Sequence, residues 1–370
     1  MVEDSLTALR SRWIGAPLEH LDTPALLLDR RACDHNLAKM AAFFDQRPAR
    51  LRPHFKNHKC VTLARRQLEA GNCVGMTCAK LGEAEILADS GFEDVLIANQ
   101  VVGDHKVERL IEVARKIDIQ VAVDHLEPAR RISRAAATAG VTVGVLVEVD
   151  IGMGRCGTPP GEATLDLVRQ LLPLPGLRFD GIQAFEGHAV YVDDPEQRSA
   201  AVRQSFQLAL DTRALLEQHG IAVGRISGGS SATYAITGTL AGVDEIQAGS
   251  YATMDWRYAR MIPDFQVALS VLTRVISTRA ETAVLDVGLK GAGCEFGPPR
   301  ILGHPDATIP HFVSEEHCVV RNAPDWTIGQ TVQLLPSHAC TTCNLHRELF
   351  VHEDGRVVDV WPMEGSGKLR

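Results

Sequence analysis

The densest group of reactive side chains in this sequence lies in segment 52–59, Arg-Pro-His-Phe-Lys-Asn-His-Lys. It follows an apolar, strand-like run, and in a barrel of parallel strands the carboxyl ends of the strands open into the active site. Neighbouring cations and apolar walls disfavour the ammonium form of a lysine, and neutral lysine is the nucleophile that forms Schiff bases. We therefore expect Lys56 to be a nucleophile, with His54 and His58 transferring protons or shaping the loop. A solvated basic loop is the alternative.

Small residues follow another strand-like run, at Ser227, Gly228, Gly229, Ser230 and Ser231. Glycine lets the backbone approach a ligand closely, and N–H groups at the start of a helix bind phosphate. Barrels commonly hold a phosphate after one of their last strands. We therefore expect a phosphate site here, although such a run is also typical of a simple turn.

Two further loops carry candidate ligands. Residues 148–157 place Arg155 among glycines after a strand, where it projects near a barrel mouth or pairs with Asp150. Near the end of the chain, His338 and Cys340 stand two apart, and on an extended segment they would point to the same side and could share a metal ion. Cys340-x-x-Cys343 is half of a zinc-ribbon pattern with no second half in the sequence. A structural zinc knuckle and a strand with a buried cysteine remain the alternatives.

The elements that must position these residues follow an alternating pattern. Strand-like runs alternate with helical segments of 10 to 20 residues, which predicts parallel βαβ units. We expect a TIM-type (β/α)8 barrel over 30–257, with one strand to spare. The surplus strand is expected to be the first, paired with the C-terminal part of the chain. The runs begin near Ala25, Leu51, Val74, Val95, Ile119, Val143, Gly181, Arg225 and Glu245.

After residue 257 the apolar pattern changes to a period of two, with turns between the runs. Asp354-Gly355 between two such runs predicts a β-hairpin. We therefore predict an α/β fold: the barrel is followed by a mostly antiparallel β-domain built from 1–29 and 258–370.

Composition narrows the range of partners. The 370 residues carry a formal net charge of −8 without a basic stripe, which argues against a nucleic-acid partner. The sequence has no apolar run long enough for a membrane span and no apolar signal-peptide core near its start. Nine scattered cysteines, an odd number, indicate reduced thiols. We expect a cytoplasmic protein with a small-molecule substrate.

Together these motifs resemble a known family. LDTPALLLD, RPHFKNHK, EVDIGMGRCG, SGGSSAT, QAGSYATMD, LDVGLK and PSHACTTCNLH occur in the same order in the D-threonine aldolase and D-serine dehydratase group of fold-type III pyridoxal-phosphate (PLP) enzymes. Their barrel is similar to that of alanine racemase, and the resemblance covers about 21–367. It implies that Lys56 is the Schiff-base residue and that Arg155 contacts the pyridine ring or its phenolate. It also implies a phosphate cradle from Ser227, Gly228, Gly229, Ser230, Ser231, Gly249, Ser250 and Tyr251.

The resemblance further implies a divalent metal on His338 and Cys340, with its open positions left to water and the substrate β-hydroxyl. Cys340 stands where the aldolases carry aspartate and the dehydratases carry a zinc-bound cysteine. A thiolate favours zinc over manganese or magnesium. The family also implies a homodimer in which the β-domain of one subunit completes the site of the other.

The reaction expected from this resemblance is lyase chemistry on D-configured β-hydroxy-α-amino acids. PLP is an electron sink, and a Lewis acid on the β-oxygen assists either of two outcomes. Our first choice is aldol cleavage to glycine and an aldehyde. A D-serine or D-3-hydroxyaspartate dehydratase, releasing a keto acid and ammonia, is the alternative, followed by a racemase. A non-catalytic PLP carrier would lack the β-domain.

Other positions depart from the aldolase pattern. Phe185 replaces a tyrosine and Ala79 a glutamine beside the cofactor, while Tyr191 stands where the proposed base histidine is expected. His188 is then a candidate base, unless it pairs with Glu186 instead. Tyr191 remains a catalytic candidate by position, and His317 is a further candidate from the β-domain.

Overall fold

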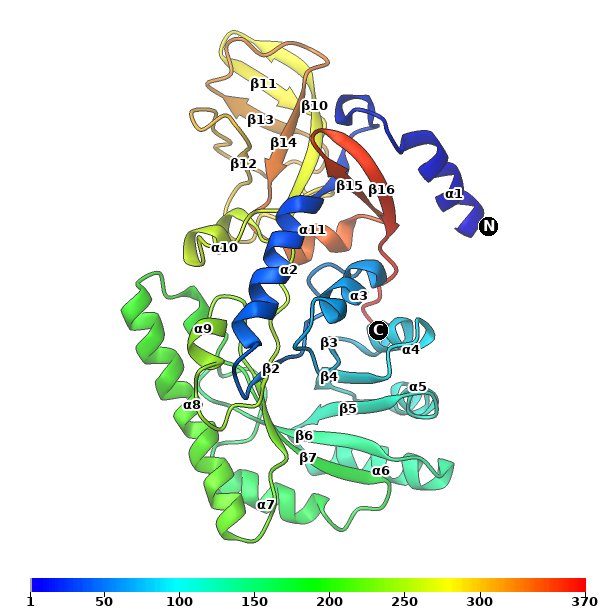
Figure 1. Cartoon of the computed structure of the whole chain (residues 1–370), viewed down its shortest axis with the longest axis vertical. Helices are drawn as coiled ribbons and strands as arrows, with labels where there is room; N and C mark the ends of the chain where they lie inside the picture. The colour runs from blue at the N-terminus through cyan, green and yellow to red at the C-terminus, as the bar shows by residue number, and fades with distance from the viewer. Residues whose placement is uncertain (1) are drawn as a thin grey trace. The chain divides into compact units, whose positions relative to one another are not determined.

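The computed structural model describes residues 2–370, with side chains from residue 6 onward, and the chain divides into two compact units (Figure 1). The barrel unit consists of Ala41–Lys56, Gln67–Gly249 and Lys368–Arg370. The β unit consists of the chain up to Met40 together with Asn57–Arg66 and Ser250–Gly367.

Parallel strands form the barrel unit. In the described residues its sheet has eight strands in the order β2-β9-β8-β7-β6-β5-β4-β3. The two ends of this order are joined by parallel bridges between Leu51 and Cys73 and between His54 and Thr77, so the sheet closes on itself. The predicted (β/α)8 barrel is confirmed. The strands are β2 Arg50–Leu51, β3 Met76–Cys78, β4 Asp94–Gln100, β5 Asp118–Val123, β6 Val143–Val149, β7 Leu177–Ala184, β8 Arg225–Gly228 and β9 Glu245–Ile246.

Helices cover the outside of this sheet, and neighbours from α4 to α8 pack against one another in sequence order (Figure 1). Helix α6 shows why: Ala129, Ile132 and Ala136 are buried at helical spacing, whereas Arg130 and Arg131 are exposed. The helices of the barrel unit are α4 Leu81–Asp89, α5 Asp104–Ala114, α6 Leu126–Ala139, α7 Glu162–Leu171, α8 Pro195–Gln218 and α9 Tyr234–Thr237, with the 3-10 helix η2 Ala189–Tyr191. Two helices divide between the units, α2 Arg30–Phe44 and α3 Val61–Glu69.

Antiparallel pairing dominates the β unit. Strand β1 (Ala25–Asp29) pairs antiparallel with β10 (Leu269–Arg279) and parallel with β15 (Glu348–Glu353), so the surplus first strand belongs to this sheet, as expected. The predicted hairpin joins β15 to β16 (Arg356–Pro362) through Asp354 and Gly355, whose positive φ angles of 47° and 76° are those of a tight two-residue turn. The other elements are β11 Thr282–Leu285, β12 Arg300–Ile301, β13 Cys318–Arg321, β14 Thr331–Leu335, α1 Val2–Trp13, η1 Leu18–His20, α10 Trp256–Met261 and α11 Ala339–Leu345.

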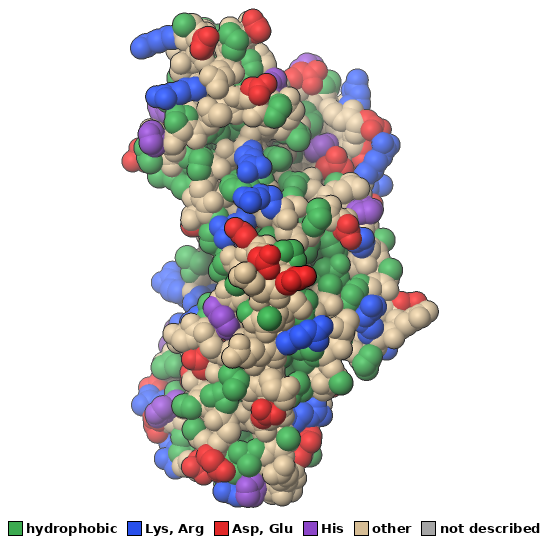
Figure 2. Space-filling view, turned by 90° about the vertical axis from the view of Figure 1, so that its left-hand side faces the viewer, with side chains coloured by type: hydrophobic (Ala, Val, Ile, Leu, Met, Phe, Trp, Pro, Cys, Tyr) green, Lys and Arg blue, Asp and Glu red, His purple; other side chains and the backbone are tan. Residues whose placement is uncertain are grey.

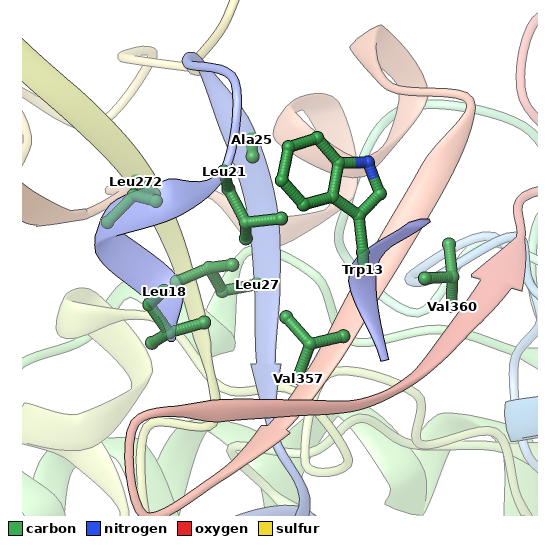
Figure 3. Packing of buried hydrophobic residues seen from close by; sticks show 8 residues of the cluster. All are labelled: Trp13, Leu18, Leu21, Ala25, Leu27, Leu272, Val357 and Val360. Atoms are coloured by element: carbon green, nitrogen blue, oxygen red, sulfur yellow. The ribbon is translucent and has the colours of Figure 1, made fainter. Parts of the chain in front are cut away.

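A hydrophobic cluster holds the first segment of the chain to this sheet (Figure 3). Trp13 from α1 packs with Leu27 of β1, Leu272 of β10 and Val357 and Val360 of β16. Burial of such side chains stabilises a fold by about 1.5–3 kcal/mol each. The cluster therefore stabilises the pairing of the first strand with this sheet.

The surface carries charges of both signs. On the face shown in Figure 2, lysine and arginine side chains are interspersed with aspartate and glutamate side chains. Among the helices of residues 2–370, none combines the length and the apolar character that a membrane crossing requires.

Candidate active site

Two cationic side chains lie near the same aromatic ring at the carboxyl ends of the barrel strands. Lys56 lies beyond the end of β2, and its Nζ is 5.9 Å from the centroid of the Phe185 ring, which follows β7. The guanidinium carbon of Arg155, in the loop after β6, is 5.2 Å from the same centroid. The structure thus brings two of the predicted site residues to one place.

Arg52, from the same motif as Lys56, has another role. Its side chain is 1% exposed, and it pairs with Glu245 at 2.9 Å and with Asp94 at 2.7 Å. Two carboxylates therefore compensate its charge inside the barrel.

Arg155 pairs with Glu148 rather than with Asp150. Its Nη2 lies 3.5 Å from Glu148, which also accepts a hydrogen bond of 2.5 Å from Gln100 Nε2. Burial raises the pKa of Glu148, and the contacts with Gln100 and Arg155 offset only part of that rise. Asp150 instead accepts backbone N–H groups of its own loop.

The small-residue loop after β8 approaches its neighbours too closely for larger side chains. A Cβ on Gly228 would lie 1.8 Å from the carbonyl oxygen of Ala184, and Gly229 has a φ of 76°. Ser230 and Ser231 are buried. The helix expected after the loop is only four residues long and begins at Tyr234, so a turn rather than a long helix presents these groups.

The buried carboxylate of Glu186 contacts this loop through Thr233. From the sequence, Glu186 is expected only as a partner for His188. Its Oε1 accepts hydrogen bonds from the hydroxyls of Thr233 and, at 3.3 Å, Thr237. Thr233 Oγ1 in turn accepts the N–H of Ser230 at 3.0 Å. Among the described residues Glu186 Oε2 has no hydrogen-bond partner. Burial raises the pKa of Glu186, and these donors lower it only in part.

The two candidate bases lie on one short segment after β7. His188 is exposed, and its Nε2 is 3.1 Å from Ser205 Oγ on α8. His188 therefore pairs with Ser205 and not with Glu186, which was the alternative expected from the sequence. Tyr191 lies on η2 and is 47% exposed. In the β unit, His317 is also exposed.

The remaining members of the expected phosphate cradle divide between the units. Ser227 and Gly249 belong to the barrel unit, whereas Ser250 and Tyr251 begin the last segment of the β unit. The hydroxyl of Ser227 accepts a hydrogen bond of 2.9 Å from Gln247. Tyr251 is 1% exposed and packs edge-on against Phe265.

His338 and Cys340 lie next to each other in the β unit, although not on an extended segment as expected. Helix α11 begins directly after His338 because Asp255 Oδ2 accepts the N–H of Ala339 at 3.0 Å. Burial alone would lower the pKa of His338, but a hydrogen bond with Cys340 and the nearby carboxylates of Glu295 and Asp255 raise it overall.

A carboxylate lies beside this pair: Glu295 Oε2 is 3.7 Å from His338 Nδ1. Residues 2–370 contain no group of three or more His, Cys, Asp or Glu side chains arranged to hold a metal, so the four-ligand zinc knuckle does not form. Cys343, the second cysteine of the CxxC, is fully buried, and burial raises the pKa of its thiol well above the usual value. His338 Nδ1 is buried and makes no hydrogen bond to any described residue.

Comparison with known proteins identifies the family. Residues 28–255 match the family model described as "Alanine racemase, N-terminal domain", and residues 268–352 match "Putative serine dehydratase domain". A D-threonine aldolase from Arthrobacter sp is 39% identical, with 96% of each chain covered. A 3-hydroxy-D-aspartate aldolase from Paracoccus denitrificans (strain Pd 1222) is 32% identical, covering 96% of this chain and 94% of the relative.

Among solved structures, the crystal structure of D-threonine aldolase from Filomicrobium marinum superimposes with a TM-score of 0.93 at 35% identity, covering 96% of this chain and 99% of the other. The family resemblance read from the motifs is confirmed. The chain therefore belongs to the alanine racemase-like family of PLP-dependent enzymes, in the group that contains the D-threonine aldolases.

Proposed function

We propose that this protein is a PLP- and divalent-metal-dependent lyase that cleaves D-configured β-hydroxy-α-amino acids, D-threonine among them, into glycine and an aldehyde. The observation that carries the proposal is the position of Lys56 and Arg155 on the Phe185 ring at the barrel mouth. The similarity to two aldolases over nearly the whole chain supports the reaction type.

The residues of the barrel mouth fit an anionic aromatic aldehyde. Lys56 would bind its aldehyde carbon through Nζ, and Arg155 would offset the negative charge of its ring oxygen. The close-packed backbone at Gly228 and Gly229 and the buried hydroxyls of Ser230 and Ser231 suit a phosphate, with Ser227 and Gly249 of the same unit as the other proposed contacts. When bound, PLP supplies an electron sink for the bond that breaks at the substrate Cα.

His338 and Cys340 are proposed to hold the metal. A histidine nitrogen and a thiolate sulfur suit zinc better than the harder manganese and magnesium ions. Two protein ligands leave positions open for water and substrate, which is the catalytic rather than the structural pattern. The metal would supply a Lewis acid for the β-oxygen of the substrate.

Cleavage of the Cα–Cβ bond also needs a base that removes the β-hydroxyl proton. We propose His188 for this step, because its exposed ring follows a barrel strand and Ser205 fixes one ring nitrogen. Tyr191, three residues further on, is the second candidate.

A dehydratase is the second candidate function, favoured by the match of residues 268–352 and by the thiol at position 340. In that reaction Lys56 would remove the Cα proton and hydroxide would leave from Cβ. Racemisation would need only exchange of the Cα proton and no metal.

A homodimer in the cytoplasm is part of this proposal. The nine cysteines of the chain are free thiols, which supports a reducing compartment. We propose a small amino acid as the only type of ligand besides the cofactors, with no nucleic acid or membrane partner.

The deciding experiment incubates the purified holoenzyme with D-threonine, D-serine and D-3-hydroxyaspartate, and measures glycine, keto acid and ammonia separately. Glycine without ammonia supports the aldolase, whereas ammonia with a keto acid supports the dehydratase. The Lys56→Ala variant should lose both the yellow absorbance and the adduct that borohydride traps. Retention of either by this variant would contradict the assignment of Lys56.

A further inference from the structure

The side-chain amide of Asn57, the residue directly after Lys56, donates a hydrogen bond to the sulfur of Cys340. The Asn57 side chain is 1% exposed, and its Nδ2 lies 3.6 Å from Cys340 Sγ. The same amide nitrogen lies 3.5 Å from the hydroxyl oxygen of Ser250, which is itself 4.0 Å from the sulfur. An amide N–H and a hydroxyl therefore converge on one sulfur atom inside the β unit.

The orientation of the Asn57 amide is fixed from behind. Thr253 Oγ1 donates a hydrogen bond of 2.8 Å to Asn57 Oδ1. Thr253 is fully buried, and its carbonyl oxygen accepts the N–H groups of Ala268 and Leu269 at the start of β10. Because the amide oxygen is occupied by this hydroxyl, the amide nitrogen is directed at Cys340.

Hydrogen-bond donors around a metal ligand orient it and stabilise its charge. Outer partners of this kind commonly change metal affinity by about 10–100-fold when they are removed. Hydrogen bonds to an anionic acceptor are roughly twice as strong as those between neutral groups. The thiolate of Cys340 would be such an acceptor, whereas Asn57 has no group that could itself bind zinc as an anion.

We propose that Asn57 is a positioning residue that holds the Cys340 sulfur for metal binding, with Thr253 fixing the Asn57 amide. This inference rests on the proposed metal site at His338 and Cys340. Asn57 belongs to the same motif as Lys56, but it is not among the residues proposed to contact the cofactor or the substrate.

The test measures zinc affinity of the PLP-loaded protein by competition with a chromophoric chelator. Asn57→Ala should weaken zinc binding by about 10–100-fold. In the cobalt-substituted protein the same variant should weaken or shift the sulfur-to-cobalt charge-transfer band. Asn36→Ala is the matched control, since Asn36 is a fully buried amide of the same unit whose side chain hydrogen-bonds to the backbone of Gln266.

Two further variants keep the test valid should Asn57→Ala fold poorly. Thr253→Val removes the hydroxyl that fixes the amide and should also weaken zinc binding. Thr253→Ser keeps the hydroxyl and should bind zinc as tightly as the parent. Unchanged affinity in Asn57→Ala and Thr253→Val, or an equal loss in Asn36→Ala, overturns the positioning role alone. A parent protein that binds PLP but no zinc overturns the metal site and this inference together.

Discussion

Two hydrogen bonds of 2.9 Å join the Arg52 guanidinium to both carboxylate oxygens of Glu245 inside the barrel. Arg52 follows β2 and Glu245 lies on β9, so the pair links neighbouring strands of the closed sheet. Asp94 on β4 binds the remaining guanidinium edge. Burial would raise the pKa of Glu245, but Arg52 outweighs this and lowers it overall.

The Arg52→Met variant should therefore lose about 3–5 kcal/mol of unfolding free energy near neutral pH, because the buried Glu245 carboxylate loses its hydrogen-bonded partner and keeps only the weaker ion pair with Arg225 at 3.6 Å. A lowered carboxyl pKa contributes stability above its unfolded value of 4.5, and this contribution disappears as the pH falls through the folded value. Urea unfolding at several pH values should thus show a difference from the parent that shrinks in acid. Arg131→Met, at an exposed pair on α6, is the control and should remain close to the parent.

Glu186→Gln should have the opposite pH dependence. Burial raises the pKa of Glu186, so its ionised form destabilises the fold at a pH above the folded value, whereas at a pH below 4.5 the acid is protonated in both states. Gln stays neutral and can still accept the hydrogen bonds of Thr233 and Thr237. Thermal unfolding should show the variant gaining stability over the parent at about pH 8, with the gain vanishing towards pH 4.5. A gain of equal size at every pH would contradict a titrating Glu186.

The sequence was sufficient to predict the features that depend on local pattern. Each of the nine expected runs overlaps a strand, although β7 begins at Leu177, four residues before the expected start at Gly181. Asp354-Gly355 forms the expected hairpin. Lys56 lies beyond the end of a barrel strand, as the sequence pattern predicts. Local pattern carries this information since side-chain periodicity and turn residues act over a few positions.

Features that depend on distant partners could not be predicted. His338 caps a helix because Asp255, 84 positions before Ala339, accepts the first N–H. Arg52 is neutralised by Glu245, 193 positions away. In both cases the deciding contact forms only when the sheet brings distant segments together, so the spacing of neighbouring residues gave no signal for it.

His188→Gln tests the proposed base. Loss of general base catalysis should lower kcat for D-threonine by about 10²–10⁴-fold. Ser205→Ala, which removes only the hydroxyl 3.1 Å from Nε2, should have a much smaller effect on kcat. Should Tyr191→Phe give the larger loss while His188→Gln stays near the parent, the base would be Tyr191.

Cys340→Asp tests whether the sulfur determines the choice of metal. A carboxylate is a harder ligand than a thiolate, so the variant should bind zinc more weakly and should be activated better by manganese or magnesium. The measurement is activity of the metal-stripped protein after addition of each ion, together with its zinc affinity. Cys294→Ser is the matched control, because Cys294 is another half-buried cysteine of the β unit and its thiol contacts only the carbonyl oxygen of Phe312 in the hydrogen bonds of residues 2–370. A variant that keeps the parent's order of metals would show that the sulfur does not set the preference.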